Sequence, residues 1–73
     1  MEEASQSKKE LAPHEQRVVD EKRQLDEKIS KLADFFSGEI FLSLDHLNRQ
    51  LLIAQHAMME SYSRILGLRI QLF

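Results

Sequence analysis

The sequence predicts an all-α protein, and three observations support this fold class. The 73 residues include only two glycines and one proline, and strong helix formers are frequent throughout. Two long segments on either side of Ser37-Gly38 repeat their apolar residues at helical spacing. The chain has no cysteine, so neither disulfides nor thiolate metal sites can stabilise it. We therefore expect an antiparallel two-helix hairpin that assembles into a homo-oligomeric helical bundle.

The N-terminal part of the chain predicts a short tail followed by the first helix. Residues 1–12 are polar and charged, and we expect a disordered tail there. The hairpin then covers residues 13–73, because Pro13 suits the first turn of a helix, where its missing N–H is not needed. The first helix is expected at about residues 14–36. Its apolar stripe is narrow and consists of Val18, Leu25, Ile29, Leu32 and Phe36.

Residues 37–43 predict a short connector between the helices. Gly38 is expected to end the first helix in a left-handed conformation. Ser43 is the expected N-cap of the second helix, which covers about residues 44–72. A connector of this length requires antiparallel helices. Its apolar residues are expected to fold back and close the end of the core, and they are Ile40, Phe41 and Leu42.

The second helix carries more apolar surface than the first helix can cover. Its apolar residues form two adjacent lines at seven-residue spacing, a pattern that suits contact with two neighbouring helices. Because 73 residues bury little surface alone, we expect the surplus to bind another copy. The expected interface residues are Leu51, Leu52, Met58, Met59, Ile65, Leu66, Leu72 and Phe73.

Composition argues against several functional classes. The chain has 10 Lys and Arg against 12 Asp and Glu, without the basic cluster that duplex nucleic acid requires. Charged residues interrupt the second helix, so no membrane span is expected. Met1–Pro13 lacks the apolar core of a signal peptide, which indicates a cytoplasmic protein. The histidines lie far apart, and no nucleophile and base share a motif. We expect no metal, no cofactor and no enzymatic activity.

A few polar residues interrupt the apolar pattern near the open end of the expected hairpin. Arg69 falls within the apolar face of the second helix, which also carries Tyr62, and Lys22 lies close to the stripe of the first helix. His14 and Arg17 come at the start of the first helix, so antiparallel packing places them nearby. In one interpretation these cations pair with carboxylates and fix the register or the oligomer. In a second, Tyr62 stacks on a base while the cations bind phosphate, which predicts a ligand site. In a third, these residues contact a peptide or another protein.

Two further positions in the second helix are expected to be unremarkable. Gly67 falls opposite the apolar face, where it weakens the helix slightly or allows a second chain to approach. His56 and Glu60 are four residues apart on the polar side and predict a solvated face. If that face were buried in an oligomer, His56 would be a pH-sensitive contact.

Two strings carry a family resemblance over roughly residues 13–73. They are HEQRVVDEKRQLDEKISKLADFF and MMESYSRILGLRIQLF, and they resemble small phage and prophage proteins related to a crAss-like phage product. That resemblance implies a phage-type protein expressed in a bacterial host and assigns no catalytic residue. In size and architecture the chain is also similar to phage anti-defence sponges, helical hairpins that trap cyclic nucleotide signals at subunit junctions.

Two functional hypotheses follow. The first is a host-defence antagonist that sequesters a small nucleotide signal at subunit junctions through Arg17, Lys22, Tyr62, Arg69 and His14. The second is an inhibitor or adaptor that docks the apolar face of the second helix on a host defence protein.

Overall fold

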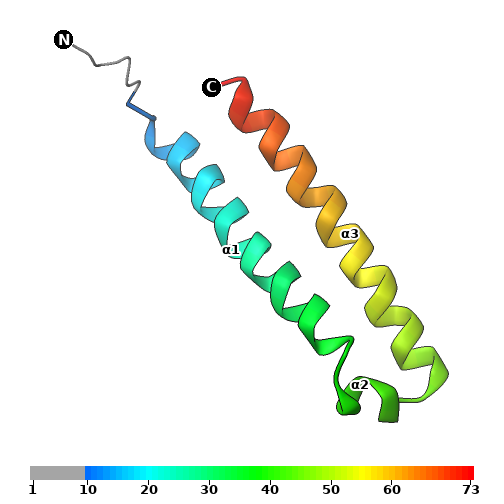
Figure 1. Ribbon diagram of the computed structural model, residues 1–73. Coiled ribbons are helices and arrows are strands. Elements are labelled where there is room, and N and C mark those ends of the chain that lie inside the picture. The colour runs from blue at the N-terminus through cyan, green and yellow to red at the C-terminus, as the bar shows by residue number, and fades with distance from the viewer. Residues whose placement is uncertain (1–9) are drawn as a thin grey trace.

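The computed structural model describes residues 10–73, which form three helices and no strand. The all-α prediction is confirmed. Helix α1 covers Pro13–Phe35, α2 covers Glu39–Ser43 and α3 covers His46–Gln71. In Figure 1, α1 and α3 lie side by side and run in opposite directions, while α2 closes the end between them. The predicted tail at residues 1–12 lies mostly outside the described residues.

The start of α1 follows the sequence prediction. Pro13 occupies the first turn, and the Ala12 backbone N–H donates a hydrogen bond of 2.9 Å to the Glu15 carboxylate. The helix ends when backbone N–H groups of Phe36, Ser37 and Gly38 turn back to carbonyls of its last turn. Gly38 has a φ of −96° and caps the start of α2, so the predicted left-handed conformation is wrong. An extended residue is sufficient here because the chain enters a new helix directly.

The connector contains the short helix α2, and only one of its apolar residues joins the core. Phe41 is buried and packs its ring 6.1 Å from Phe35 and 5.0 Å from Phe36 between centroids. Ile40 and Leu42 are 66% and 64% exposed, so the prediction that all three fold back is wrong for these two. A single helical turn can point only one of three consecutive side chains toward the hairpin.

The N-cap of α3 lies two residues later than predicted. Leu44 is extended, and the Asp45 carboxylate accepts a hydrogen bond of 3.0 Å from the Asn48 backbone N–H. Asp45 is therefore the N-cap. The prediction of Ser43 is wrong because its hydroxyl donates instead to the Ile40 carbonyl within α2, at 2.7 Å.

The two long helices bury little surface. Only Val18, Phe41 and Leu66 are buried apolar residues among those described, and Leu66 is the one that is fully enclosed. Most of the less exposed residues between His46 and Phe73 recur in steps of four and three, and members of this line contact α1. We call this line the inner seam, and it consists of Leu52, His56, Met59, Ser63, Leu66, Ile70 and Phe73.

The inner seam settles two of the sequence expectations. His56 is not on a solvated face, because its side chain is only 18% exposed and its ring lies 5.3 Å from the Phe36 ring. Gly67 is half-buried beside α1 rather than opposite the apolar face. A helical wheel centred on the exposed apolar residues of α3 places His56 and Gly67 on the polar side. Helix α1 packs against a different face of α3, and both residues lie against it.

Candidate functional site

A polar cluster joins the two long helices near the middle of their contact. The Lys22 ammonium donates to the Asp26 carboxylate at 2.8 Å and to the Ser63 hydroxyl at 3.1 Å. The Ser63 hydroxyl donates in turn to the other Asp26 oxygen at 2.5 Å. These three bonds close a triangle across the α1–α3 interface. We call this set of three residues the Lys22 triad.

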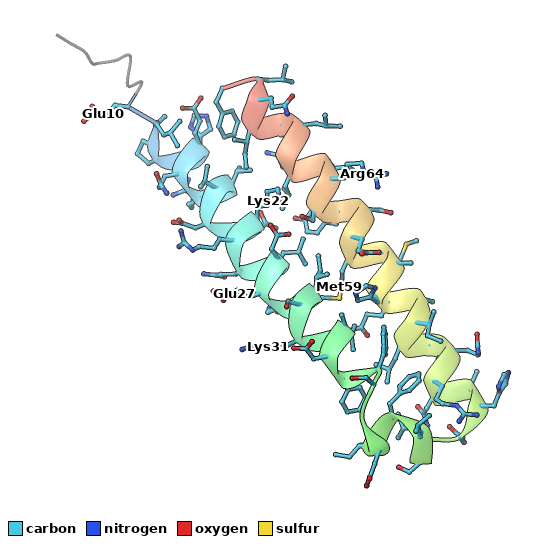
Figure 2. The ribbon with its side chains drawn as sticks, in the orientation of Figure 1. Glu10, Lys22, Glu27, Lys31, Met59 and Arg64 are labelled. Atoms are coloured by element: carbon cyan, nitrogen blue, oxygen red, sulfur yellow. The ribbon has the colours of Figure 1, made fainter. Side chains whose placement is uncertain are left out.

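The position of the triad follows from helical spacing. Lys22 occupies the step between Val18 and Leu25 in the α1 stripe, so its chain leaves the helix toward α3. In Figure 2, Lys22 points toward α3, whereas Glu27 and Lys31 point away from it. Ser63 is only 8% exposed, and a buried hydroxyl of this kind needs a partner. The Lys22 ammonium and the Asp26 carboxylate provide it.

The charges of the triad are largely satisfied within it. The Lys22 side chain is 31% exposed and that of Asp26 is 46% exposed. The hydrogen bond from Lys22, followed by the one from Ser63, lowers the pKa of the Asp26 carboxyl below its ordinary value of 3.8. Asp26 is therefore ionised at neutral pH and neutralises much of the Lys22 charge. It is correspondingly a weak base.

Gly67 provides room for the Lys22 side chain. A Cβ at this position would lie 3.2 Å from the Lys22 Cε, which is tighter than ordinary van der Waals contact. The lysine stem can therefore lie against the backbone of α3 and reach Ser63 one turn earlier. This close approach is the structural role of the glycine.

An open groove lies beside the triad and has a volume of about 550 Å³. Its floor includes Gly67, and Arg64 and Gln71 extend its polar lining along α3. Arg64 is exposed, and no hydrogen bond or ion pair among residues 10–73 engages its guanidinium. We call this feature the Lys22 groove, and its polar lining is Lys22, Asp26, Glu60, Ser63, Arg64 and Gln71. A second hollow of about 470 Å³ shares Lys22 and Asp26 and extends over α1 toward Val19 and Arg23.

Tyr62 makes a separate link between the helices. Its hydroxyl donates to the Glu21 carboxylate, and the residue is 43% exposed. This hydrogen bond raises the pKa of Tyr62 above 10.0, and partial desolvation and the negative charge of Glu21 act in the same direction. The nearby positive charge of Arg69 acts in the opposite direction. Tyr62 and Arg69 are therefore neighbours, and neither lines either hollow.

The five residues predicted to bind a ligand do not gather around one cavity. Lys22 lines the groove, Tyr62 bonds to Glu21, and His14, Arg17 and Arg69 are exposed. Within the described part of the chain, no hydrogen bond or ion pair engages the guanidinium of Arg17 or Arg69. Arg69 thus has no carboxylate partner among residues 10–73.

The eight residues predicted as an oligomer interface divide into two sets. Leu52, Met59, Leu66 and Phe73 belong to the inner seam. The other four are exposed, namely Leu51, Met58, Ile65 and Leu72. Helix α1 is therefore one of the two neighbours that the spacing predicted for α3. The second neighbour stays a prediction.

Sequence reasoning missed the most organised part of the site. Asp26, Ser63 and Gln71 are not among the predicted site residues, since a serine on an apolar face is usually incidental. One signal in the sequence could have revealed it. The alternating spacing of four and three residues from Leu52 to Leu66 passes through His56 and Ser63. A polar residue that falls on such a line opposite a lysine is a candidate for a buried hydrogen bond.

The fold and the groove define a small all-α protein of two long helices joined by an internal polar triad, with an open groove of mixed charge beside it. The chain belongs to the Sequestin family, whose model matches residues 12–72. It matches no curated protein and no solved structure. Over residues 10–73, none of the helices combines the length and the apolar character needed to cross a bilayer. The same residues contain no cluster of three His, Cys, Asp or Glu placed to hold a metal ion.

Proposed function

We propose that this protein is a non-enzymatic phage-type protein that sequesters a small nucleotide signal of bacterial host defence. Membership in the Sequestin family indicates a sequestering, binding function. We further propose that the ligand is a nucleotide, that binding antagonises host defence, and that the protein acts as a homo-oligomer in the bacterial cytoplasm. The observation that carries it is the Lys22 groove, with the guanidinium of Arg64 at its edge.

The groove has the size and the chemistry for such a ligand. Small-molecule sites typically enclose about 300–1,000 Å³, and the groove holds about 550 Å³. Because Asp26 already pairs with Lys22, we assign the main phosphate contact to Arg64, whose planar guanidinium can bind two phosphate oxygens at once. Gln71 and Ser63 provide hydrogen-bonding groups for a sugar or base, and Ile29 and Leu68 offer apolar surface.

The cations outside the groove form a second candidate surface. Tyr62 could stack on a base beside Arg69, with Arg17 and His14 on α1 as further contacts. Neither Tyr62 nor Arg69 lines either hollow, so this second surface offers no recess that could enclose a ligand. We therefore place the ligand in the Lys22 groove and use Arg69 to test the alternative location.

Sequestration without turnover also fits the chemistry of the triad. The Ser63 hydroxyl donates a hydrogen bond to the Asp26 carboxylate, but the lowered pKa of that carboxyl makes it a weak base for abstracting the Ser63 proton. We therefore expect a bound nucleotide to be released intact when the protein is denatured.

The test is calorimetric titration with cyclic dinucleotides, cyclic trinucleotides and cyclic ADP-ribose isomers. The expected result is tight binding of one ligand class, loss of at least tenfold in affinity for Arg64→Ala, and recovery of unmodified ligand after heating. Arg23→Ala is the matched control, because Arg23 is exposed, pairs with Asp20 and lines only the second hollow, not the Lys22 groove. A larger loss for Arg69→Ala than for Arg64→Ala would move the site to the Tyr62 side. No heat from any ligand would refute nucleotide sequestration.

A second function is supported by the exposed apolar residues of α3. Leu47, Leu51 and Met58 are 65%, 59% and 67% exposed, which suits docking of this helix in the groove of a host defence protein. This inhibitor or adaptor function predicts a small free oligomer that still exposes apolar surface and therefore binds hydrophobic dyes. A closed oligomer that does not bind dye would argue against it.

A further inference from the structure

Helix α3 carries a second apolar line on the side that does not meet α1. Its positions follow one another in steps of four and three from Leu47 to Leu72, which is three and a half heptads. All eight positions are exposed, and six of them are large apolar residues between 53% and 86% exposed. We call this line the outer seam, and it consists of Leu47, Leu51, Ala54, Met58, Ser61, Ile65, Leu68 and Leu72.

A seam of this length and spacing is built to meet another helix. A sustained alternation of four and three residues over three or more heptads is the pattern of a coiled coil. An irregular apolar patch that bound a globular partner would have no reason to keep this step along the whole helix. The occupant is therefore a helix of comparable length, and this chain offers one in α3 itself.

The order of large and small residues selects the direction of pairing. The steps read the same from either end, so an antiparallel copy centred on the seam uses all eight positions. Leu47 then lies opposite Leu72, and Leu51 opposite Leu68. Ala54 lies opposite Ile65 in this arrangement.

The same register places Ser61 opposite Met58. Every small residue of the seam thus meets a large one, which gives even packing. Parallel pairing would place Ala54 opposite Ala54 and Ser61 opposite Ser61, leaving two layers underfilled.

We propose that two copies of this chain pair antiparallel through α3, in the register that joins the Ala54 layer of one copy to the Ile65 layer of the other. The seam is thereby self-complementary and closes a dimer by a two-fold axis. The hairpin on its own buries only three apolar residues among those described, so the dimer supplies core that the single chain lacks.

The pairing also bears on the Lys22 groove. Leu68 belongs to both the outer seam and the lining of the groove, so Leu51 of the second copy packs at the edge of the groove. The second copy then completes the ligand site on that edge. This consequence rests on the proposed nucleotide binding, whereas the pairing itself does not.

Single cysteines provide the sharpest test because the natural chain has none. An Ala54→Cys chain carrying a tag is mixed with an untagged Ile65→Cys chain, unfolded and refolded together, and equilibrated in a glutathione buffer. Antiparallel pairing predicts the mixed disulfide between the two chains as the main product. It predicts few disulfides between two Ala54→Cys chains, since their thiols would lie eleven residues apart along the axis, or about 16 Å. Dominant links between identical chains would overturn the orientation.

Light scattering on the natural chain and on charged variants completes the test. The natural chain is expected at twice its 8.6 kDa mass. Ile65→Lys is expected to give a monomer. Because Ile65 is 53% exposed and lies off the inner seam, this variant should keep the same two-helix fold. Ile53→Lys is the control, because Ile53 is 45% exposed and lies off both seams. A natural chain that stays monomeric at high micromolar concentration would refute the dimer, whatever its ligand binding shows.

Discussion

Leu66 offers the clearest test of the contact between α1 and α3. It is the only fully buried side chain among the described residues, with a relative exposure of 0%, and it lies on the inner seam. Leu66→Ala removes this apolar volume and leaves a cavity between the helices. Such substitutions cost about 2–5 kcal/mol, and a two-helix contact can relax more than a deep core, so we expect about 2–3 kcal/mol.

That loss is large for a protein of this size. In a domain of 60–100 residues each kcal/mol lowers the melting temperature by about 4–8 °C, so Leu66→Ala should lower it by about 10–20 °C. Urea unfolding followed by far-ultraviolet circular dichroism suits this chain, which is largely helical and has no tryptophan. Every variant is measured at one protein concentration, because association would change the apparent stability.

Ile53→Ala is the matched control for this measurement. Ile53 is also on α3 but is 45% exposed and off both seams, so its loss should cost about 1 kcal/mol or less. Equal losses for the two variants would show that Leu66 is not packed between the helices. The described contact of α1 with α3 would then be wrong in register.

Three further predictions concern single groups. NMR titration should place the pKa of Asp26 below 3.8, and stability should fall as pH drops through that lowered pKa, a dependence that Asp26→Asn reduces. Phenolate absorbance reports Tyr62 alone, the one tyrosine, and its raised pKa should move toward 10.0 in Glu21→Gln; no change would exclude that hydrogen bond. Asp45→Ala should lower stability by about 1 kcal/mol and Ser43→Ala by less; the reverse order would restore Ser43 as the cap.

Much of the fold could be predicted because its signals are local. The start of α1 at Pro13 follows from the fixed φ of proline and its missing donor. The helical nature of both long segments follows from propensity and apolar spacing. The caps were harder to predict. Ser43 and Asp45 are both good N-caps, and only the extended backbone of Leu44 excludes the earlier one.

The candidate site was only partly predictable, because its residues come from two helices whose register is not local information. Lys22 stood out as a charge in an apolar stripe. Ser63 and Asp26 did not, since each is ordinary until the other helix is placed beside it. Tyr62 and Lys22 were grouped because both lie toward the open end of the hairpin. In the structure they have different partners across the helix contact.

The sequence by itself determined that the chain is helical and that α3 carries two apolar lines at heptad spacing. Only the tertiary structure decided which line meets α1, because adjacent lines on one helix are nearly equivalent in hydrophobicity. The inner seam meets α1 because it matches the features of that helix. His56 meets Phe36 at the closed end, and Ser63 and Gly67 accommodate Lys22 near the middle. A line made only of large apolar residues would leave the buried part of Lys22 without a partner.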